Sequence, residues 1–241
     1  MKRLNELIDV GRMQAFCLEQ AAKARMEPEP EPDPAAERRA RQRWLSEIGF
    51  GARYWEPRWD LVVSELAAPL RDFCADLPER LRTGSGMLIG GGVGVGKTQS
   101  LALLALAAMG VRFLRVDGDL PQRPEVRYVF APTLYERMFA RDPEARADLR
   151  DWEQCDLLLL DDFDRIHASP QSDWLLGRVE AFAETRYATL RSTVVTFNNT
   201  APLADPRLAR TVDRWRETQQ VVIVQGASRR KPLNGGDESA G

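Results

Sequence analysis

Residues 86–98 decide the fold, and they read Gly86-Met87-Leu88-Ile89-Gly90-Gly91-Gly92-Val93-Gly94-Val95-Gly96-Lys97-Thr98. The apolar run 86–90 predicts a strand, and the leucine- and alanine-rich residues 98–109, closed by Gly110, predict a helix. Residues 91–98 between them fit the pattern G-x-x-x-x-G-K-[ST]. A glycine-rich turn of this pattern between a strand and a helix is typical of a phosphate-binding loop, so the sequence predicts a P-loop nucleotide-binding domain.

The backbone and side chains of this loop suit a bound triphosphate and a metal ion. Glycines let successive N–H groups point toward a phosphate, and the N-terminus of the following helix adds partial positive charge. Lys97 is expected to contact the β- and γ-phosphates, and Thr98 is expected to ligate Mg²⁺. The predicted nucleotide-binding residues are Gly91, Gly92, Val93, Gly94, Val95, Gly96, Lys97 and Thr98.

Two acids follow a second predicted strand. Four leucines, residues 157–160, end in Asp161 and Asp162, about sixty residues after the loop, as in a Walker B strand. Asp161 is expected to hold Mg²⁺, and Asp162 is expected to orient or deprotonate the attacking water. The alternative is that both aspartates only cap the following turn. Many P-loop ATPases carry a glutamate as the catalytic acid, so the shorter Asp162 predicts slow turnover.

A third predicted strand also ends in polar side chains. Residues 193–197 form the strand, and Asn198 and Asn199 follow it. At the carboxyl edge of a parallel sheet, an amide can hydrogen-bond both the γ-phosphate and the attacking water. Asn198 is the candidate for this role, and Asn199 is expected to be a turn residue.

Short apolar runs alternate with longer helical segments from residue 86 onward. This alternation predicts an α/β fold in which a parallel sheet is flanked by crossover helices. The expected strands are 86–90, 111–116, 126–130, 156–160, 193–197 and 221–224, and the expected helices are 98–109, 172–187 and 205–216. Residues 111–116 and 126–130 are candidates for a hairpin-like elaboration, and the sequence leaves their pairing open.

The sequence before residue 84 predicts a helical extension. Small apolar residues recur at helical spacing and predict a first helix with one apolar stripe, formed by Leu4, Ile8, Gly11, Ala15, Leu18 and Ala22. Residues 27–34 alternate proline with acids, which favours an extended spacer, and residues 35–48 predict a second, arginine-rich helix. The predicted domains are residues 1–34, a helical lead-in over 35–83, a core over 84–230 and a disordered tail over 231–241.

Composition excludes several classes of function. The 241 residues suffice for one main domain, and 34 basic against 36 acidic residues give a net charge of −2, which excludes a protein coated in positive charge. Three widely spaced cysteines and a single histidine exclude a zinc finger, a disulfide framework and Ser-His-Asp chemistry. The longest apolar run, 101–111, is too short for a bilayer, and polar residues interrupt any N-terminal signal, so a cytoplasmic protein without a membrane partner is expected.

Arginines near the C-terminus are candidates to sense the nucleotide. On the helix opened by Asp205, the side chains of Arg207, Arg210 and Arg214 share one face. Such a face can deliver a planar cation to the γ-phosphate of a neighbouring subunit, or it can pair with acids of the same helix. The basic residues 226–231 either fold back over the nucleotide or begin the tail.

Taken in order, these motifs resemble the DnaC/IstB-type ATPases, which are AAA+ helicase loaders and transposition helpers. The resemblance covers roughly residues 53–230 and is carried by the P-loop, the double-aspartate strand, Thr196-Phe197-Asn198, Val212-Asp213-Arg214 and Gly226-Ala227-Ser228-Arg229-Arg230. It implies that Asn198 is sensor 1, that Arg214 is the arginine finger with Arg210 as the second candidate, and that Arg230 is the sensor 2 arginine. The sequence departs from the family at Arg229, where a tyrosine is usual, and at residues 117–125, which resemble an insertion.

The resemblance also implies an activity and partners. It implies an ATPase that uses ATP and Mg²⁺, forms a homo-oligomer through its arginine finger, assembles on single-stranded DNA and delivers a ring helicase, with residues 1–34 gripping the client. The alternatives are a transposition helper that activates a transposase, a nucleotide-gated adaptor that barely hydrolyses ATP, and a P-loop kinase acting on a small metabolite.

Overall fold

A computed structural model of the chain describes residues 33–115, 118, 120–168 and 172–225. The chain divides between Arg39 and Ala40, inside helix α2 (Pro34–Glu47), and the sheet and the remaining helices belong to the second unit. The predicted N-terminal apolar stripe, most of the proline spacer, Arg230 and the predicted tail lie outside the described residues. Within the described ranges, no helix combines the length and the apolar character that crossing a bilayer requires.

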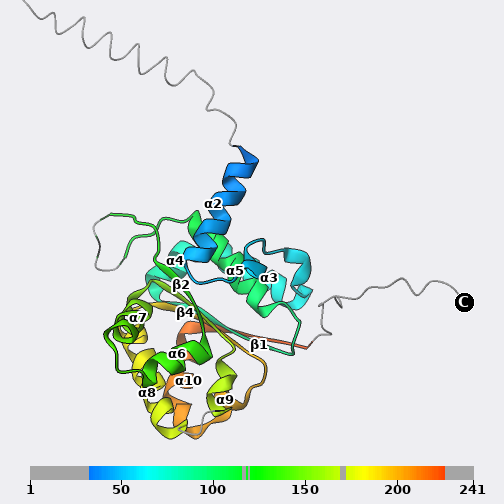
Figure 1. Cartoon of the computed structure of the whole chain (residues 1–241). Helices are drawn as coiled ribbons and strands as arrows, with labels where there is room; N and C mark the ends of the chain where they lie inside the picture. The colour runs from blue at the N-terminus through cyan, green and yellow to red at the C-terminus, as the bar shows by residue number, and fades with distance from the viewer. Residues whose placement is uncertain (1–32, 116–117, 119, 169–171, 226–241) are drawn as a thin grey trace, which may run out of the picture. The chain divides into compact units, whose positions relative to one another are not determined.

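Five parallel strands form one sheet in the order β2-β3-β4-β1-β5 (Figure 1). The strands are β1 (Gly86–Gly91), β2 (Val126–Phe130), β3 (Leu157–Asp161), β4 (Ser192–Phe197) and β5 (Gln219–Val224). β3 and β4 are buried along their whole length, as strands of a parallel sheet covered on both faces are, and this explains their continuous apolar sequences. The predicted parallel α/β fold is therefore confirmed.

Helices cover both faces of the sheet, and alternate residues of each strand face the two layers. One layer consists of α3 (Ser64–Ala75), α4 (Leu77–Thr83) and α5 (Lys97–Met109), packed on a face that includes Met87, Ile89 and Leu159. The other layer consists of α6 (Ala131–Phe139), α7 (Pro143–Gln154), α8 (Ser172–Ala188) and α10 (Ala209–Thr218), packed on a face that includes Leu88, Leu158 and Val195.

Short helical turns complete the described fold. They are η2 (Ala52–Tyr54), η3 (Trp59–Leu61), η4 (Phe163–Ala168), α9 (Ala201–Ala204) and η5 (Pro206–Leu208). The Asp205 side chain accepts a hydrogen bond from the Arg207 N–H and so caps η5, as an aspartate before a helical proline is expected to do. The single helix predicted over 205–216 is instead this 3₁₀ turn followed by α10.

The predicted strand over residues 111–116 is wrong where the structure describes it. Residues 111–115 contribute one isolated antiparallel bridge, between Phe113 and Gln122, and no strand of the sheet. The edge position beside β3 is taken by β2, which pairs with it in parallel from Val126 to Phe130. Pro121 and Pro124 lack the N–H groups that a longer hairpin requires, and the described residues between 111 and 125 form a single bridge and no ladder.

Candidate nucleotide site

The glycine-rich loop joins the C-terminal end of β1 to the N-terminus of α5. Gly94 and Gly96 have φ angles of +86° and +96°, in the left-handed region that favours glycine. A Cβ at Gly96 would lie 2.3 Å from the carbonyl oxygen of Leu61 in η3. Glycine is therefore required at this position both by the turn and by the close approach of η3.

The Lys97 ammonium lies inside the loop. It donates hydrogen bonds to the carbonyl oxygens of Gly91 (2.7 Å) and Gly92 (2.8 Å) and to Oδ1 of Asn198 (2.9 Å). Lys97 is only 7% exposed. The hydrogen bond to Asn198 joins the loop to the end of β4, so two predicted site residues 101 positions apart in the sequence are in direct contact.

Asp161, the last residue of β3, is surrounded by hydroxyl groups. Its Oδ2 accepts hydrogen bonds from Thr98 Oγ1 (2.8 Å) and from the Tyr128 hydroxyl (3.0 Å), and its Oδ1 accepts one from Thr196 Oγ1. Burial raises the pKa of this carboxyl, and the three hydroxyl donors oppose that rise. Thr98 and Asp161, the two predicted metal ligands, thus form a hydroxyl–carboxylate pair, which is the hard oxygen donor set that Mg²⁺ prefers.

Asp162 and Asn198 form the polar rim next to the lysine. Asp162 has a φ of +58°, which aspartate tolerates better than most residues, and its N–H donates to Thr196 Oγ1 (3.0 Å). Asn198 Nδ2 donates to Asp162 Oδ1 at 3.0 Å, and the Asn198 N–H donates to Asp164 Oδ1 at 2.8 Å. The Asn198 amide therefore connects the ammonium of Lys97 with the carboxylate of Asp162.

A cavity of about 570 Å³ opens above these groups. Its walls come from the loop, from the ends of β2, β3 and β4, and from residues 53–61 of the lead-in. The size lies within the range of ligand pockets in proteins. The lining combines an apolar side, with Tyr54 and Leu61, and a polar side, with Lys97, Asp161 and Asn198, which suits a ligand that has one apolar and one anionic end.

Sequence analysis did not identify two residues of this site, Thr196 and Tyr128. Thr196 bridges the two aspartates, because its hydroxyl donates to Asp161 and accepts from the Asp162 N–H. The sequence signal that could have identified Thr196 is its hydroxyl close to the end of an otherwise apolar strand. Tyr128 reaches Asp161 from the neighbouring strand β2, and no local pattern in the sequence indicates that contact.

The predicted arginines of α10 lie apart from this cavity. Arg214 forms an ion pair with Glu184 of α8, and its guanidinium lies 4.7 Å from the centroid of the Tyr187 ring. Arg210 is 73% exposed along its side chain, and its Nε lies 3.8 Å from Glu180 Oε1. Arg207 pairs with Asp205 and Asp173. The structure therefore brings together the loop, Asp161, Asp162 and Asn198, but it does not bring these arginines to the same cavity.

No protein-family profile and no curated protein sequence matches this chain. Solved structures match it with the fold of AAA+ P-loop proteins. The DnaC helicase loader superposes with a TM-score of 0.53 at 20% identity, over 72% of this chain and 99% of that chain. DnaA bound to AMPPCP and single-stranded DNA gives 0.52 at 17% identity, and AMPPCP-bound DnaA from Aquifex aeolicus gives 0.51 at 18%.

This chain spans about half the length of the two DnaA chains, with 51% of each covered, and aligns over 72% of its own residues with each. Together with the strand order, the matches define the class, an AAA+ P-loop fold. The matches confirm the P-loop fold that the sequence predicts.

Proposed function

We propose that this chain binds ATP with Mg²⁺ in the cavity above the loop and hydrolyses it slowly. The observation that carries the proposal is the Asn198 amide, which accepts from Lys97 Nζ and donates to Asp162 Oδ1. A phosphate-binding cation, a polar amide and a carboxylate in direct contact form the set of groups that phosphoryl transfer to water needs. They lie at the carboxyl edge of a parallel sheet, where ligands of this fold class bind.

Each group has a distinct role in the proposed reaction. Lys97 and the N–H groups of the loop hold the phosphates of ATP, and Thr98 and Asp161 would hold Mg²⁺. When bound, the metal supplies positive charge that neutralises the phosphate oxygens. Asn198 orients the attacking water, and Asp162 accepts its proton.

Slow turnover follows from the position of the general base. Asp162 is one methylene shorter than glutamate, and its carboxylate is held both by Asn198 Nδ2 and by Arg165, whose Nε lies 3.4 Å from Oδ2. These partners hold the base in place before substrate binds. The same contacts favour, as a second candidate, an adaptor that binds ATP with negligible hydrolysis.

We further propose a helicase loader that assembles on single-stranded DNA and delivers a ring helicase. The DnaC-like fold supports this, and so does an exposed aromatic pair between α6 and α8. The rings of Phe139 and Trp174 stack with centroids 4.7 Å apart, the two residues are 37% and 49% exposed, and the Arg178 guanidinium lies 5.7 Å from the Trp174 ring. Aromatic platforms with adjacent arginines bind unstacked bases and their phosphates.

Calorimetry and steady-state ATP turnover, with and without single-stranded DNA, test the proposal. We expect Mg-ATP binding and slow, DNA-stimulated hydrolysis by the wild-type chain. Lys97→Ala should lose binding, whereas Asp162→Asn should keep binding and lose about 99% or more of the turnover, because a general base typically contributes about 10²–10⁴-fold to the rate. Arg216→Ala, at an exposed site on α10, is the control and should behave as wild type.

The DNA part of the proposal has its own variant. Trp174→Ala should weaken the binding of a fluorescent oligonucleotide about fivefold or more, because one base stacked on an aromatic ring contributes about 1–3 kcal/mol. It should also raise the DNA concentration needed for half-maximal stimulation of turnover by a similar factor, while leaving the basal rate unchanged. Absence of heat on titration with Mg-ATP would contradict the ATPase, and a measurable rate that DNA does not change would contradict the loader. A negligible rate with tight binding would identify the adaptor.

A further inference from the structure

Tyr128 is the one hydroxyl donor to Asp161, among the described residues, that belongs neither to the glycine loop nor to the strand of the predicted sensor. We propose that Tyr128 is a positioning residue of the metal site, which fixes the orientation of the Asp161 carboxylate and is itself fixed by residues 48–50 of the lead-in. This inference rests on the proposed binding of Mg-ATP, because it concerns the carboxylate that would hold the metal.

The sheet register brings Tyr128 to Asp161. β2 pairs with β3 so that Tyr128 lies opposite Leu159 and Phe130 lies opposite Asp161. Tyr128 and Asp161 are therefore diagonal neighbours, and residues two apart on a strand point to the same face. The diagonal separation is within reach of a long aromatic side chain, and the hydroxyl lies 3.0 Å from Asp161 Oδ2.

The Tyr128 hydroxyl acts on the same oxygen as the predicted metal ligand Thr98. Asp161 Oδ2 accepts both hydroxyls, at 3.0 Å and 2.8 Å, while Oδ1 accepts Thr196. With donors on both oxygens, the carboxylate has one preferred rotation about its χ2 angle. Removal of the Tyr128 hydroxyl leaves Oδ2 with a single donor, so the carboxylate should gain rotational freedom in a site where the metal requires defined geometry.

The Tyr128 ring is held from outside the sheet. β2 is an edge strand, and on its outer side the Tyr128 N–H donates to the Ile48 carbonyl oxygen at 2.8 Å. Phe50 stacks on the Tyr128 ring with centroids 4.0 Å apart and an interplanar angle of 25°. Gly49 has a φ of +112°, and a Cβ there would lie 2.6 Å from the Tyr128 carbonyl oxygen.

Phe50 therefore supports the Tyr128 ring from the outer side, while Ile48 and Gly49 lie against the backbone of Tyr128. Phe50 is 2% exposed, so its ring is fixed by packing and limits the tilt of Tyr128. The position of residues 48–50, directly after α2, therefore bears on the metal site through two side chains in contact, Phe50 and Tyr128.

Binding of a fluorescent ATP analogue, titrated with Mg²⁺ and repeated in excess EDTA, tests the inference without measuring activity. Tyr128→Phe keeps the stacked ring and removes only the hydroxyl. We expect it to raise the Mg²⁺ concentration for half-maximal binding about tenfold or more, because loss of an outer-shell hydrogen-bond partner typically costs about 10–100-fold in metal affinity. The dissociation constant in EDTA and the melting temperature should stay near wild-type values, which a merely structural role would not predict.

Matched variants separate the hydroxyl from the fold. Tyr135→Phe removes another buried hydroxyl, which donates to the Phe163 carbonyl oxygen at 2.9 Å, and it should leave the Mg²⁺ requirement unchanged. Phe50→Leu should raise the Mg²⁺ requirement in the wild-type background and have less effect in the Tyr128→Phe background, because both changes act on one contact. Equal effects of Phe50→Leu in the two backgrounds would overturn the supporting role of Phe50.

The two proposals fail in different ways. If the wild-type chain binds the analogue neither with nor without Mg²⁺, the proposed function and this inference fall together. If Mg²⁺ strengthens binding to the wild-type chain and Tyr128→Phe responds to Mg²⁺ as the wild type does, only the positioning role is overturned.

Discussion

Two charged side chains are buried at the centre of the site, Lys97 and Asp161, which are 7% and 4% exposed. Burial is the larger influence on the Asp161 carboxyl and raises its pKa, so the ionised form is less stable in the folded chain than in water. A chain that keeps such a carboxyl loses stability at neutral pH. Carboxyl groups whose pKa is shifted by burial in a cavity are candidates for functional sites, and the Lys97 contacts in the same cavity agree with this.

Burial also controls the reactivity of Cys74 on α3. Desolvation raises the pKa of its thiol from 9.0 to about 11. Only the thiolate reacts with alkylating reagents, so at pH 8 the folded chain should react at Cys74 about a hundredfold more slowly than an ordinary thiol. Because the pKa is raised, the rate should still increase about tenfold per pH unit between pH 8.5 and 9.5.

Iodoacetamide labelling of Cys74, quantified by mass spectrometry of its peptide, measures this difference. The urea-unfolded chain is the control, and its labelling rate should rise only about threefold between pH 8.5 and 9.5, because a solvated thiol with a pKa of 9.0 is already half ionised at pH 9. A folded chain whose labelling rate also rises only about threefold over this range would show that the Cys74 thiol is not desolvated.

Single site residues can be predicted from the sequence when their place in the site depends only on their position at the end of a strand or the start of a helix. Lys97, Asp161 and Asn198 each stand at the end of a predicted strand or the start of a helix, so their convergence follows from a parallel sheet. The contact of Tyr128 with Asp161 depends on the register between β2 and β3, which are separated by two helices. No local pattern encodes that register, so Tyr128 could not be predicted as a site residue.

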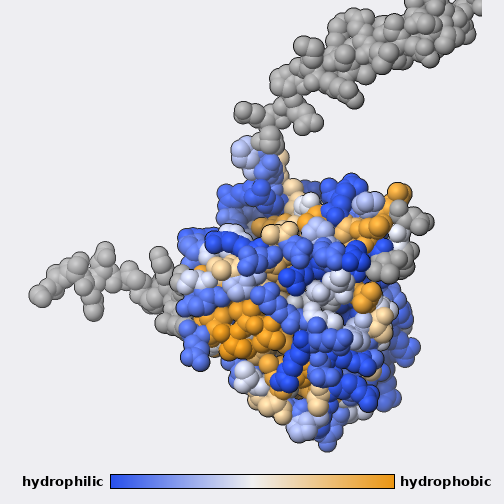
Figure 2. Space-filling view, turned by 180° about the vertical axis from the view of Figure 1, so that it is seen from behind, coloured by the Kyte–Doolittle hydropathy of each residue, from blue (hydrophilic) through white to orange (hydrophobic). Residues whose placement is uncertain are grey.

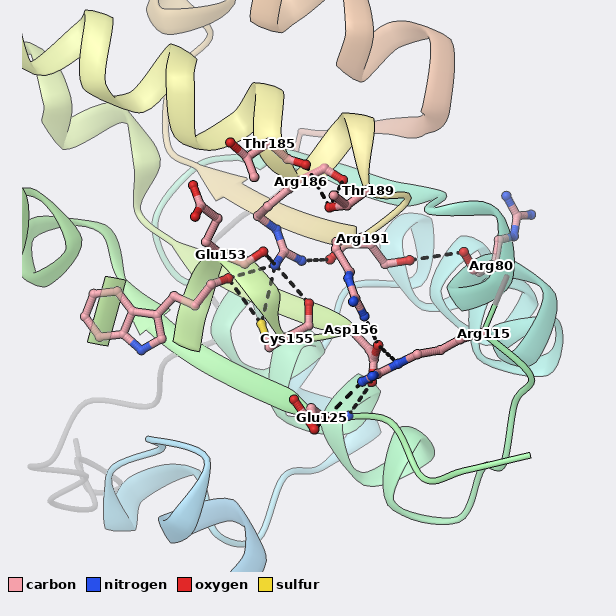
Figure 3. Close-up of polar contacts among 12 residues, drawn as sticks. Arg80, Arg115, Glu125, Glu153, Cys155, Asp156, Thr185, Arg186, Thr189 and Arg191 are labelled. Carbon is pink, nitrogen blue, oxygen red and sulfur yellow. Dashed lines mark hydrogen bonds and ion pairs between the residues drawn. The ribbon is translucent and has the colours of Figure 1, made fainter. Parts of the chain in front are cut away.

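At the scale of elements, one buried side chain joins a helix and two strands (Figure 3). Arg186 of α8 is 1% exposed, and its Nη1 donates to the carbonyl oxygens of Trp152 (2.7 Å) and Cys155 (2.9 Å). Its Nε donates to Thr193 Oγ1 at 2.9 Å, and its Nη2 donates to the Ser192 carbonyl oxygen. The last carbonyl groups of a helix lack hydrogen-bond donors within the helix, and Arg186 supplies such a donor at the end of α7. The same side chain contacts the residues at the starts of β3 and β4.

Replacing Arg186 should therefore destabilise the whole core. Arg186→Met keeps an unbranched apolar stem but leaves these buried carbonyls without a donor, and we expect a loss of about 3–5 kcal/mol in the free energy of unfolding. Arg186→Lys should recover only part of it, because an ammonium cannot reach the same set of acceptors as a planar guanidinium. Urea unfolding followed by circular dichroism gives the values.

Arg216→Met, at an exposed position of α10, is the matched control and should change the free energy of unfolding by less than about 0.5 kcal/mol. If Arg186→Met were as mild as this control, water or a rearranged backbone would have to satisfy the carbonyls, and Arg186 would not be the element that joins α7 to the sheet.

The same region explains why the element prediction over 111–116 is wrong. Asp156, at 2% exposure, precedes β3 and accepts hydrogen bonds from Arg115 (2.7 and 2.6 Å), from Arg191 and from the Glu125 N–H (2.8 Å) (Figure 3). The ion pair between Arg115 and Asp156 holds the loop around residue 113 in place, where a strand would be held by a ladder of backbone hydrogen bonds. The alternation of apolar and polar residues around residue 113 is typical of a strand. The local sequence there does not distinguish a strand from a loop, whereas the tertiary contact of Arg115 with Asp156 does.

At the scale of the whole molecule, the predicted arginine finger does not contribute to the cavity among the described residues. Its described lining includes Arg53 and Arg165, but none of the three arginines predicted on one face of α10. The face shown in Figure 2 is largely hydrophilic but also carries hydrophobic areas. The edge strand β5 leaves Val221 and Ile223 46% and 48% exposed. Exposed apolar surface of this kind marks interaction sites, which agrees with the proposed homo-oligomer.

Within that proposal, the contacts on α10 favour Arg210 over Arg214 as the arginine finger. Arg214 is engaged by Glu184 and covers the Tyr187 ring, whereas Arg210 extends with 73% of its side chain exposed and only a 3.8 Å approach to Glu180. A finger must leave its own chain and reach a γ-phosphate of the next one, so a side chain with weak intramolecular contacts loses less on assembly.

Mixing two inactive variants tests the shared site. Lys97→Ala removes phosphate binding and Arg210→Ala removes the finger, so each alone should show little turnover. In a randomly mixed assembly, about a quarter of the sites combine an intact loop with an intact neighbouring finger, and turnover should return to about a quarter of the wild-type value. Arg214→Ala mixed with Lys97→Ala is the comparison. If Arg214→Ala is the variant that is inactive alone and recovers turnover when mixed with Lys97→Ala, the finger is Arg214. If neither mixture recovers turnover, each chain completes its own site.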